Sequence, residues 1–263
     1  MNLEIIESVP IGGIYAGVAL LMMLCCEIGY RIGDRARTRQ DKEAPASLGS
    51  MVGGLLAMLG FVLALSFSMA ASQHDLRKSN VLEEANAIGT AYLRADLLDP
   101  RHRGTVQELL REYVDVRLQA VAVLPLDVVV SKSLEIHSRL WAEVVTAAME
   151  TPDTNTALAV QSINHVIDLH EKRLTGAVHN RIPVTVWISL FLISAFTMAT
   201  IGIQVGLTGK RRLIAIIPLV LAFSVLVTLV VDLNRPSSGL ITVGQQAMLD
   251  VQRGMRASPG HVP

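Results

Sequence analysis

Four long runs without a charged residue constrain this chain more than any other feature of its sequence. They cover Ser8–Cys26, Ala44–Gln73, Ile182–Gly209 and Leu213–Val231. A helix advances about 1.5 Å per residue, so roughly 20 apolar residues cross the hydrocarbon of a bilayer. A helix also satisfies its own backbone hydrogen bonds, which lipid cannot do. The sequence therefore predicts an all-α protein with four transmembrane helices, at about 9–30, 48–72, 183–207 and 213–232.

The composition agrees with a membrane protein that also has a substantial polar part. Mean hydropathy is +0.45, yet 17% of residues are charged, and most of these lie between the second and third runs. The net charge of zero gives no support for nucleic-acid binding. The two cysteines, Cys25 and Cys26, are adjacent within the first run, so we interpret them as apolar filler. We expect no metal site and no cofactor.

The first run could also be a cleaved signal peptide. A signal peptide begins with basic residues, whereas Glu4 and Glu7 precede this run without Lys or Arg. We expect a retained helix.

The polar middle, residues 74–181, is predicted to form an antiparallel helical bundle inserted between the second and third spans. Asp99-Pro100, Pro125 and Thr151-Pro152 divide it into four amphipathic helices, because proline interrupts a helix. The first and fourth helices are expected to be continuous with spans two and three. The predicted division is thus 1–73 for spans one and two, 74–181 for the bundle, 182–240 for spans three and four, and 241–263 for a partly disordered tail. Within this tail we expect one weak helical stretch at about Gln245–Arg253.

Short basic loops indicate the orientation. The segment Arg31–Ser47 carries five basic residues, and the turn Thr208–Arg212 carries three. Loops of this kind stay in the cytoplasm, which places the bundle and both termini on the other side of the inner membrane. That other side also carries basic residues near the span ends, such as Arg77 and Arg235.

Small residues follow one face of span two at spacings of three and four. This face, called the span-two seam, consists of Gly49, Gly53, Ala57, Gly60, Ala64 and Ser68. Small residues let helices approach closely in lipid. The seam therefore indicates either packing within one subunit, or packing around the axis of an oligomer where it lines a narrow path.

Two polar stripes lie in the predicted bundle. One consists of Glu83, Asn86, Thr90 and Arg94, and the other of Gln161, Asn164 and Asp168. One hypothesis is that the stripes face each other and bring Arg94 near Asp168, because a buried charge needs a partner. The alternative is that both stripes are solvated faces.

Charged residues at the span ends allow two interpretations each. Glu27 lies within about one turn of Arg31 and is interpreted as an interfacial ion pair rather than part of a proton path. Asp232, after span four, is interpreted either as an ion pair or ion site at a pore mouth or as a helix end and interfacial anchor. Arg235 either shares that role or pairs with a carboxylate of the bundle.

Several segments together resemble a known family. They are Glu84–Leu98, Arg111–Arg117, Leu140-Trp141, Ile163–His170 with Arg173, and Asp232–Pro236 with Gly239. The chain resembles the bacterial bestrophin-like membrane proteins, a family of unknown function. Asn234 departs from the pattern, since a second Asp is expected there.

The resemblance implies distant kinship with the bestrophin anion channels. Those have four spans, a helical region between spans two and three, and a ring of subunits whose second spans line the pore. They keep the helical region in the cytosol, opposite to the orientation indicated above. Their acidic calcium-binding run after the last span is absent from Asp232–Gly239 here.

These observations leave three possible functions. The first is a homo-oligomeric channel or channel-like pore for small anions. The second is a membrane-anchored sensor or interaction module, and the third a structural membrane protein without transport. No Gly-rich phosphate loop or nucleophile arrangement is recognisable, so we do not expect an enzyme.

Overall fold

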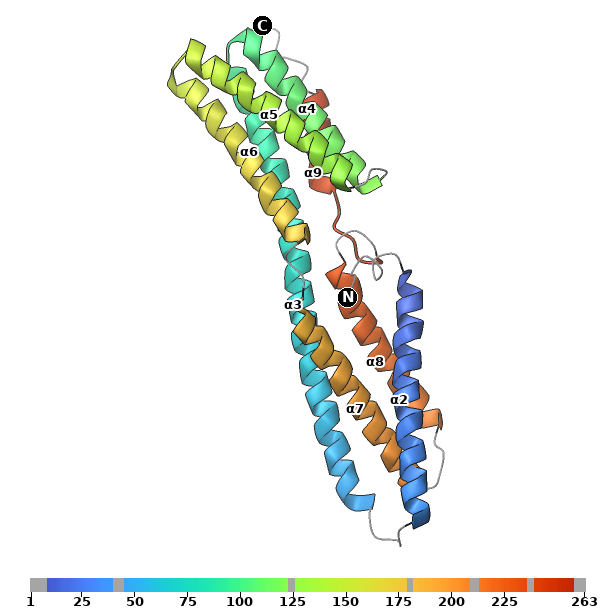
Figure 1. Cartoon of the computed structure of the whole chain (residues 1–263). Helices are drawn as coiled ribbons and strands as arrows, with labels where there is room; N and C mark the ends of the chain where they lie inside the picture. Colours follow the sequence, from blue (N-terminus) through green and yellow to red (C-terminus); the bar gives the residue numbers. More distant parts are fainter. Residues whose placement is uncertain are drawn as a thin grey trace. The chain divides into compact units, whose positions relative to one another are not determined.

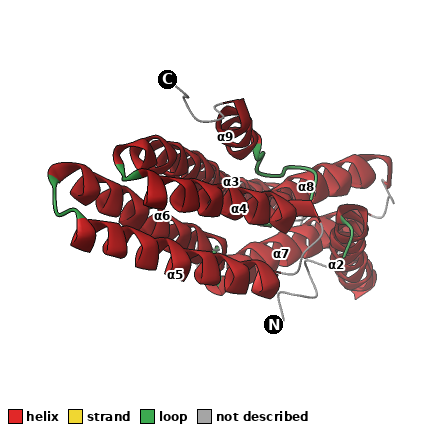
Figure 2. Ribbon diagram, turned by 90° about the horizontal axis from the view of Figure 1, so that it is seen from above, coloured by secondary structure: helices red, strands yellow, loops and turns green. Residues whose placement is uncertain are grey.

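The computed structural model describes residues 9–39, 45–122, 126–178, 182–208, 213–235 and 239–257. Every regular element in these ranges is helical, as Figures 1 and 2 show. The α-helices are α2 (Ile11–Arg39), α3 (Pro45–Arg94), α4 (Pro100–Ala122), α5 (Leu126–Glu150), α6 (Thr154–Val178), α7 (Val184–Thr208), α8 (Leu213–Asn234) and α9 (Gln246–Ala257). A short 3-10 helix, η1 (Ala95–Leu97), follows α3.

The chain divides into two compact units. The membrane unit comprises Met1–His74 and Arg181–Thr242, and therefore contains α2, α7, α8 and the first part of α3. The bundle unit comprises Asp75–Asn180 and Val243–Pro263, and contains the end of α3 with η1, α4, α5, α6 and α9. Each unit has its own hydrophobic core.

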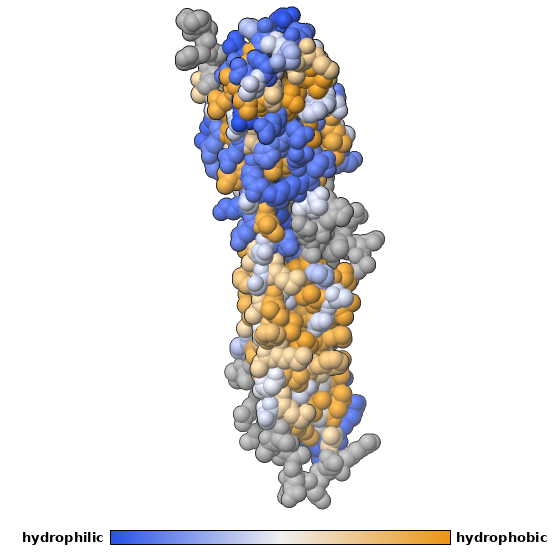
Figure 3. All heavy atoms as spheres, turned by 90° about the vertical axis from the view of Figure 1, so that its left-hand side faces the viewer, coloured by the Kyte–Doolittle hydropathy of each residue, from blue (hydrophilic) through white to orange (hydrophobic). Residues whose placement is uncertain are grey.

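The four spans predicted from the charge-free runs are confirmed as four long apolar helices. They lie within α2, α3, α7 and α8, and each is long and apolar enough to cross a bilayer. On the face of the membrane unit that Figure 3 shows, the surface is largely hydrophobic, which suits contact with lipid. Phe61, Phe196 and Leu20 are more than 60% exposed. The basic residues Lys42, Lys210, Arg211 and Arg212 lie outside the described residues.

Within the membrane unit, glycines bring α2 and α7 into backbone contact. A Cβ added at Gly29 would lie 1.9 Å from the carbonyl oxygen of Ala199, and one at Gly202 would lie 2.0 Å from that of Cys26. Gly33 and Gly206 make the same kind of contact one turn further along. Close packing of this sort is the main source of helix association in lipid, where apolar burial gives no advantage.

The bundle unit follows the predicted helix boundaries closely. α4 begins at Pro100, and α5 ends at Glu150, two residues before Pro152. Asp153 caps α6 by accepting the backbone N–H of Thr156 at 2.8 Å. Antiparallel neighbours are joined by Lys172 with Glu83 (α6 and α3) and Arg139 with Glu112 (α5 and α4). The core is apolar, with Ile88, Leu110, Leu140 and Ile163 fully buried.

One expected feature differs from the structure. The helix α6 does not run into span three, because Ile182 and Pro183 are not helical and α7 begins at Val184. The helical stretch predicted in the tail at about Gln245–Arg253 is confirmed as α9, which packs on the bundle through Met248 and Met255. Its amphipathic pattern supplies the apolar face that α4 covers. Residues 258–263 lie outside the described residues.

The glycine contact between α2 and α7 generates a first prediction. Gly202→Ala or Gly29→Ala places a methyl group against the backbone of the facing helix, so the helices must separate. We expect a loss of about 1–3 kcal/mol of stability, as for other overpacked cores. Thermal unfolding in detergent measures it. Gly17→Ala on α2 is the matched control, because nothing lies within 4 Å of its added Cβ. Equal stability of all three variants would refute the close contact.

Candidate functional site

The span-two seam faces outward from the membrane unit. Gly49, Gly53, Ala57, Gly60, Ala64 and Ser68 are all exposed. The buried face of the same part of α3 is formed by Val52, Leu59, Leu63, Ser66 and Ala70. Nothing in the described structure lies within 4 Å of a Cβ added at Gly53 or Gly60. At Gly53 and Gly60 the seam therefore does not pack against another helix of its own subunit. A Cβ at Gly49 would lie 3.6 Å from Nε2 of Gln204 on α7.

The membrane exit after α8 is a set of side chains that hold backbone segments. The buried carboxylate of Asp232 accepts the N–H groups of Leu240 (3.0 Å) and Ile241 (2.9 Å). Arg235 donates to the carbonyl oxygen of Val9 at 2.9 Å. Within the membrane unit these two exit residues thus hold two different backbone segments.

Two further residues of this motif have clear structural roles. Gly239 has φ of +146°, and a Cβ there would lie 2.2 Å from Oδ1 of Asp232, so only glycine fits. Asn234 accepts the N–H of Ile182 at 3.2 Å through its side-chain oxygen. The substitution of Asn for the expected Asp therefore keeps a hydrogen-bond acceptor at the entry to α7.

The ion pair predicted at the end of the first span is also present. Nε of Arg31 lies 3.0 Å from Oε1 of Glu27, four residues earlier on α2. Both side chains are partly exposed, as expected for an interfacial pair.

A buried polar network joins the helices of the bundle unit, and sequence reasoning did not predict it. Its centre is Glu84 on α3, which is fully buried. Tyr113 on α4 donates a hydrogen bond to Glu84 at 2.5 Å, and Nε of Arg117 lies 3.3 Å from the same carboxylate oxygen. Arg173 on α6 donates to the other oxygen. One carboxylate therefore fixes three helices relative to one another.

The network extends to α5 and towards α9. The ring of His137 on α5 lies 4.8 Å from that of Tyr113 and 4.8 Å from that of His170, measured between ring centroids. Arg173 also donates to the side chain of Gln245, just before α9, at 3.1 Å.

The charge states follow from these contacts. Burial alone would raise the pKa of Glu84, which lies beyond the apolar part of α3, but Arg117 and Arg173 outweigh it and hold the pKa below its usual value. Burial, aided by Glu84, raises the pKa of Tyr113 well above 10.0. The single phenolic proton goes to Glu84, so Nδ1 of His170, 3.0 Å from the Tyr113 oxygen, must be the donor of that second bond.

Both histidines of the network are neutral at neutral pH. Burial lowers the pKa of His137 to about 4, and burial together with Arg117 lowers that of His170 to about 3. Both nitrogens of His137 and Nε2 of His170 have no hydrogen-bond partner within the described ranges. Among the same residues no group of three or more His, Cys, Asp or Glu is arranged to hold a metal ion.

The signal for this network was present in the motifs that carry the family resemblance. Glu84 opens the first motif, Tyr113 and Arg117 lie in the second, and His170 and Arg173 belong to the fourth. A single motif does not show which of its residues meet those of another motif in the fold. His137 lies outside all of these motifs.

The predicted contact between Arg94 and Asp168 is wrong. Arg94 donates to the carbonyl oxygen of Leu158 at 3.4 Å, and Asp168 accepts from Asn164 at 2.9 Å. Asp168 lies ten residues beyond Leu158 on α6, or about 15 Å along the helix axis.

The remaining stripe residues fit the alternative of solvated faces. Asn86, Thr90, Gln161, Asn164 and Asp168 are exposed. Glu83 pairs with Lys172 at 2.6 Å, and both side chains are about half exposed.

Comparison with known proteins identifies one relationship. A family model described as the bestrophin-like domain matches residues 19–248. The match includes all the motif residues described above. No curated protein and no solved structure matches the chain.

The central position of Glu84 predicts unequal effects at two adjacent glutamates. Glu84→Gln leaves Arg117 and Arg173 without their carboxylate, and breaking a buried pair costs about 3–5 kcal/mol. Glu83→Gln, the matched control, removes an exposed pair worth about 0–1 kcal/mol. Denaturant unfolding followed by circular dichroism measures both. Similar losses in the two variants would contradict the central role of Glu84.

The two neutral histidines predict acid sensitivity. Below about pH 6.5 the unfolded chain binds protons at His137 and His170, whereas the folded bundle resists protonation until about pH 4. Stability should therefore fall as the pH drops through this window. His137→Phe keeps a ring beside Tyr113 but cannot titrate. The stability of this variant should therefore fall less steeply than that of wild type as the pH decreases. Unfolding at a series of pH values compares the two slopes, and parallel slopes would refute the assignment.

Proposed function

Because the chain belongs to the bestrophin-like family, we propose that it is a multi-pass membrane protein that assembles into a homo-oligomeric, channel-like pore for small anions. The four apolar helices supply the membrane part of such an assembly. The kinship that the family name expresses supplies the expectation that second spans surround a common axis. We propose transport rather than catalysis as its activity.

The exposed seam of α3 is the observation that carries this proposal. Six small residues follow one face of the helix that the family places at the pore, and they lie exposed rather than in the core of the subunit. Intramolecular close packing is supplied instead by the glycines of α2 and α7. A surface of small residues offers close approach to the same surface of neighbouring copies.

The chemistry of the seam suits a narrow, uncharged constriction. It contains glycine, alanine and one serine, and therefore no fixed charge. Constrictions of this kind control conduction by the ease with which water and ions enter them. Asp232 and Arg235 already hold backbone segments, so ion entry in this proposal does not depend on them.

The orientation is a further part of the proposal. The basic residues Arg31, Arg35 and Arg37 near the end of α2 support a cytoplasmic position for that end and an extracytoplasmic position for the bundle and both termini. A cysteine placed at Lys42 should then resist membrane-impermeant reagents in intact cells. Labelling of that cysteine from outside would reverse the orientation.

Anion flux into proteoliposomes tests the pore. Gly53→Leu and Gly60→Leu fill the seam and should abolish most of the flux. Gly54→Leu is the matched control, since Gly54 is equally exposed but lies about 100° around the helix from Gly53. Wild type and this control should conduct alike. If Gly54→Leu reduced the anion flux as much as Gly60→Leu, the seam would not be the lining of the pore.

Absence of flux from wild type, over a range of pH, would overturn the channel proposal. The sensor or structural interpretation would then account better for the fold.

A further inference from the structure

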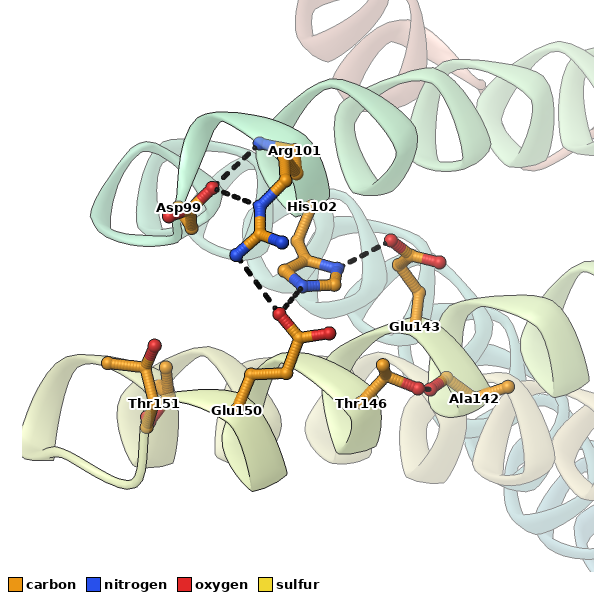
Figure 4. Close-up of polar contacts among 9 residues, drawn as sticks. Asp99, Arg101, His102, Ala142, Glu143, Thr146, Glu150 and Thr151 are labelled. Atoms are coloured by element: carbon orange, nitrogen blue, oxygen red, sulfur yellow. Dashed lines mark hydrogen bonds and ion pairs between the residues drawn. The ribbon is translucent and has the colours of Figure 1, made fainter.

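A second polar cluster lies at the start of α4 and the end of α5, away from the Glu84 network. Figure 4 shows its members, Asp99, Arg101, His102, Glu143 and Glu150. His102 is in the first turn of α4, and its side chain is only 10% exposed. Its Nδ1 lies 2.8 Å from Oε1 of Glu143, and its Nε2 lies 3.3 Å from Oε2 of Glu150.

This geometry requires a charged imidazole. Carboxylates only accept hydrogen bonds, so each ring nitrogen that faces one must carry a hydrogen. A neutral histidine has one such hydrogen and would present a lone pair to the other carboxylate. Both contacts are therefore satisfied only when His102 holds two ring protons and a positive charge.

The charged groups around His102 come from both sides of the contact. Asp99 and Arg101 flank it on its own segment, where Nε of Arg101 lies 3.1 Å from Asp99. Glu143 and Glu150 face it from α5, and Arg101 also reaches Glu150 at 3.1 Å. With His102 protonated, the cluster holds three carboxylates and two cations, and its net charge is −1. Loss of the histidine proton would make that net charge −2.

The position of Glu150 adds to this dependence. It is the last residue of α5, where the helix dipole disfavours a carboxylate and favours a nearby cation. Asp153, the next acidic group along the chain, is occupied by the cap of α6. His102 and Arg101 are thus the cations that stabilise this helix end.

We propose that His102 is a pH-dependent contact between two helices. When protonated it holds the start of α4 against the end of α5, and loss of its proton releases this contact. The hydrogen bond to Glu143, reinforced by Glu150, raises the pKa of His102 despite its burial. A group whose pKa is raised in the fold contributes its stability below the ordinary pKa and loses it as the pH rises through the raised value. This pH-dependent contact does not depend on the proposed anion transport.

Histidine titration in the intact protein tests this. The ring signals of His102 in detergent-solubilised, histidine-labelled protein, assigned with His102→Gln, should titrate with a midpoint above 6.5. Glu143→Gln and Glu150→Gln should each lower that midpoint by about one pH unit. Glu112→Gln, an exposed glutamate of α4 paired with Arg139, is the matched control and should leave it unchanged.

Hydrogen exchange supplies a second readout. Amides at the start of α4 and the end of α5 should lose protection as the pH rises through the His102 midpoint, after correction for the intrinsic rate. In His102→Gln their protection should not change over that window. A His102 midpoint at or below 6.5, or one insensitive to both glutamine variants, would overturn the proposal.

Discussion

The backbone contact between α2 and α7 is the interaction on which the membrane unit depends. In lipid, apolar burial does not drive helices together, so association requires close packing. Gly29, Gly33, Gly202 and Gly206 provide it by removing every side chain from the crossing. These glycines hold α2 against α7, whereas Gly53 and Gly60 of α3 have nothing within 4 Å of an added Cβ in the described structure. The proposed pore therefore rests on two sets of small residues, the buried glycines of α2 and α7 and the exposed seam of α3.

The bundle unit assembles differently, because the surface that Figure 3 shows there is largely polar. Apolar burial drives its assembly, and the polar groups within the core specify how the helices align. Glu84 receives Tyr113 and Arg117 from α4 and Arg173 from α6, so a slip of either helix would leave buried charge without a partner. The histidines beside it are kept neutral, whereas His102 at the bundle end is kept charged. Burial among cations produces the first behaviour, and two facing carboxylates produce the second.

Much of the fold could be predicted from the sequence, because the relevant signals are local. Charge-free runs predicted the spans, and the prolines at 100, 125 and 152 predicted the helix ends. Contacts between helices could not be predicted, because they depend on register. The Arg94–Asp168 hypothesis placed each residue on a plausible face but at different heights of the bundle. Small residues occur on α2, α3 and α7 alike, so only the structure distinguishes the buried glycines from the exposed seam. The Glu84 network was scattered over three motifs whose meeting no single motif reveals.

In the proposed pore, the seam of α3 meets another copy of the chain. Cysteine cross-linking in membranes tests it most directly, after Cys25 and Cys26 are replaced by alanine. Gly53→Cys or Gly60→Cys should form intermolecular disulfides under mild oxidation, whereas Gly54→Cys should do so much less. Efficient cross-linking at position 54 with none at 53 or 60 would contradict it, because the seam would then face lipid.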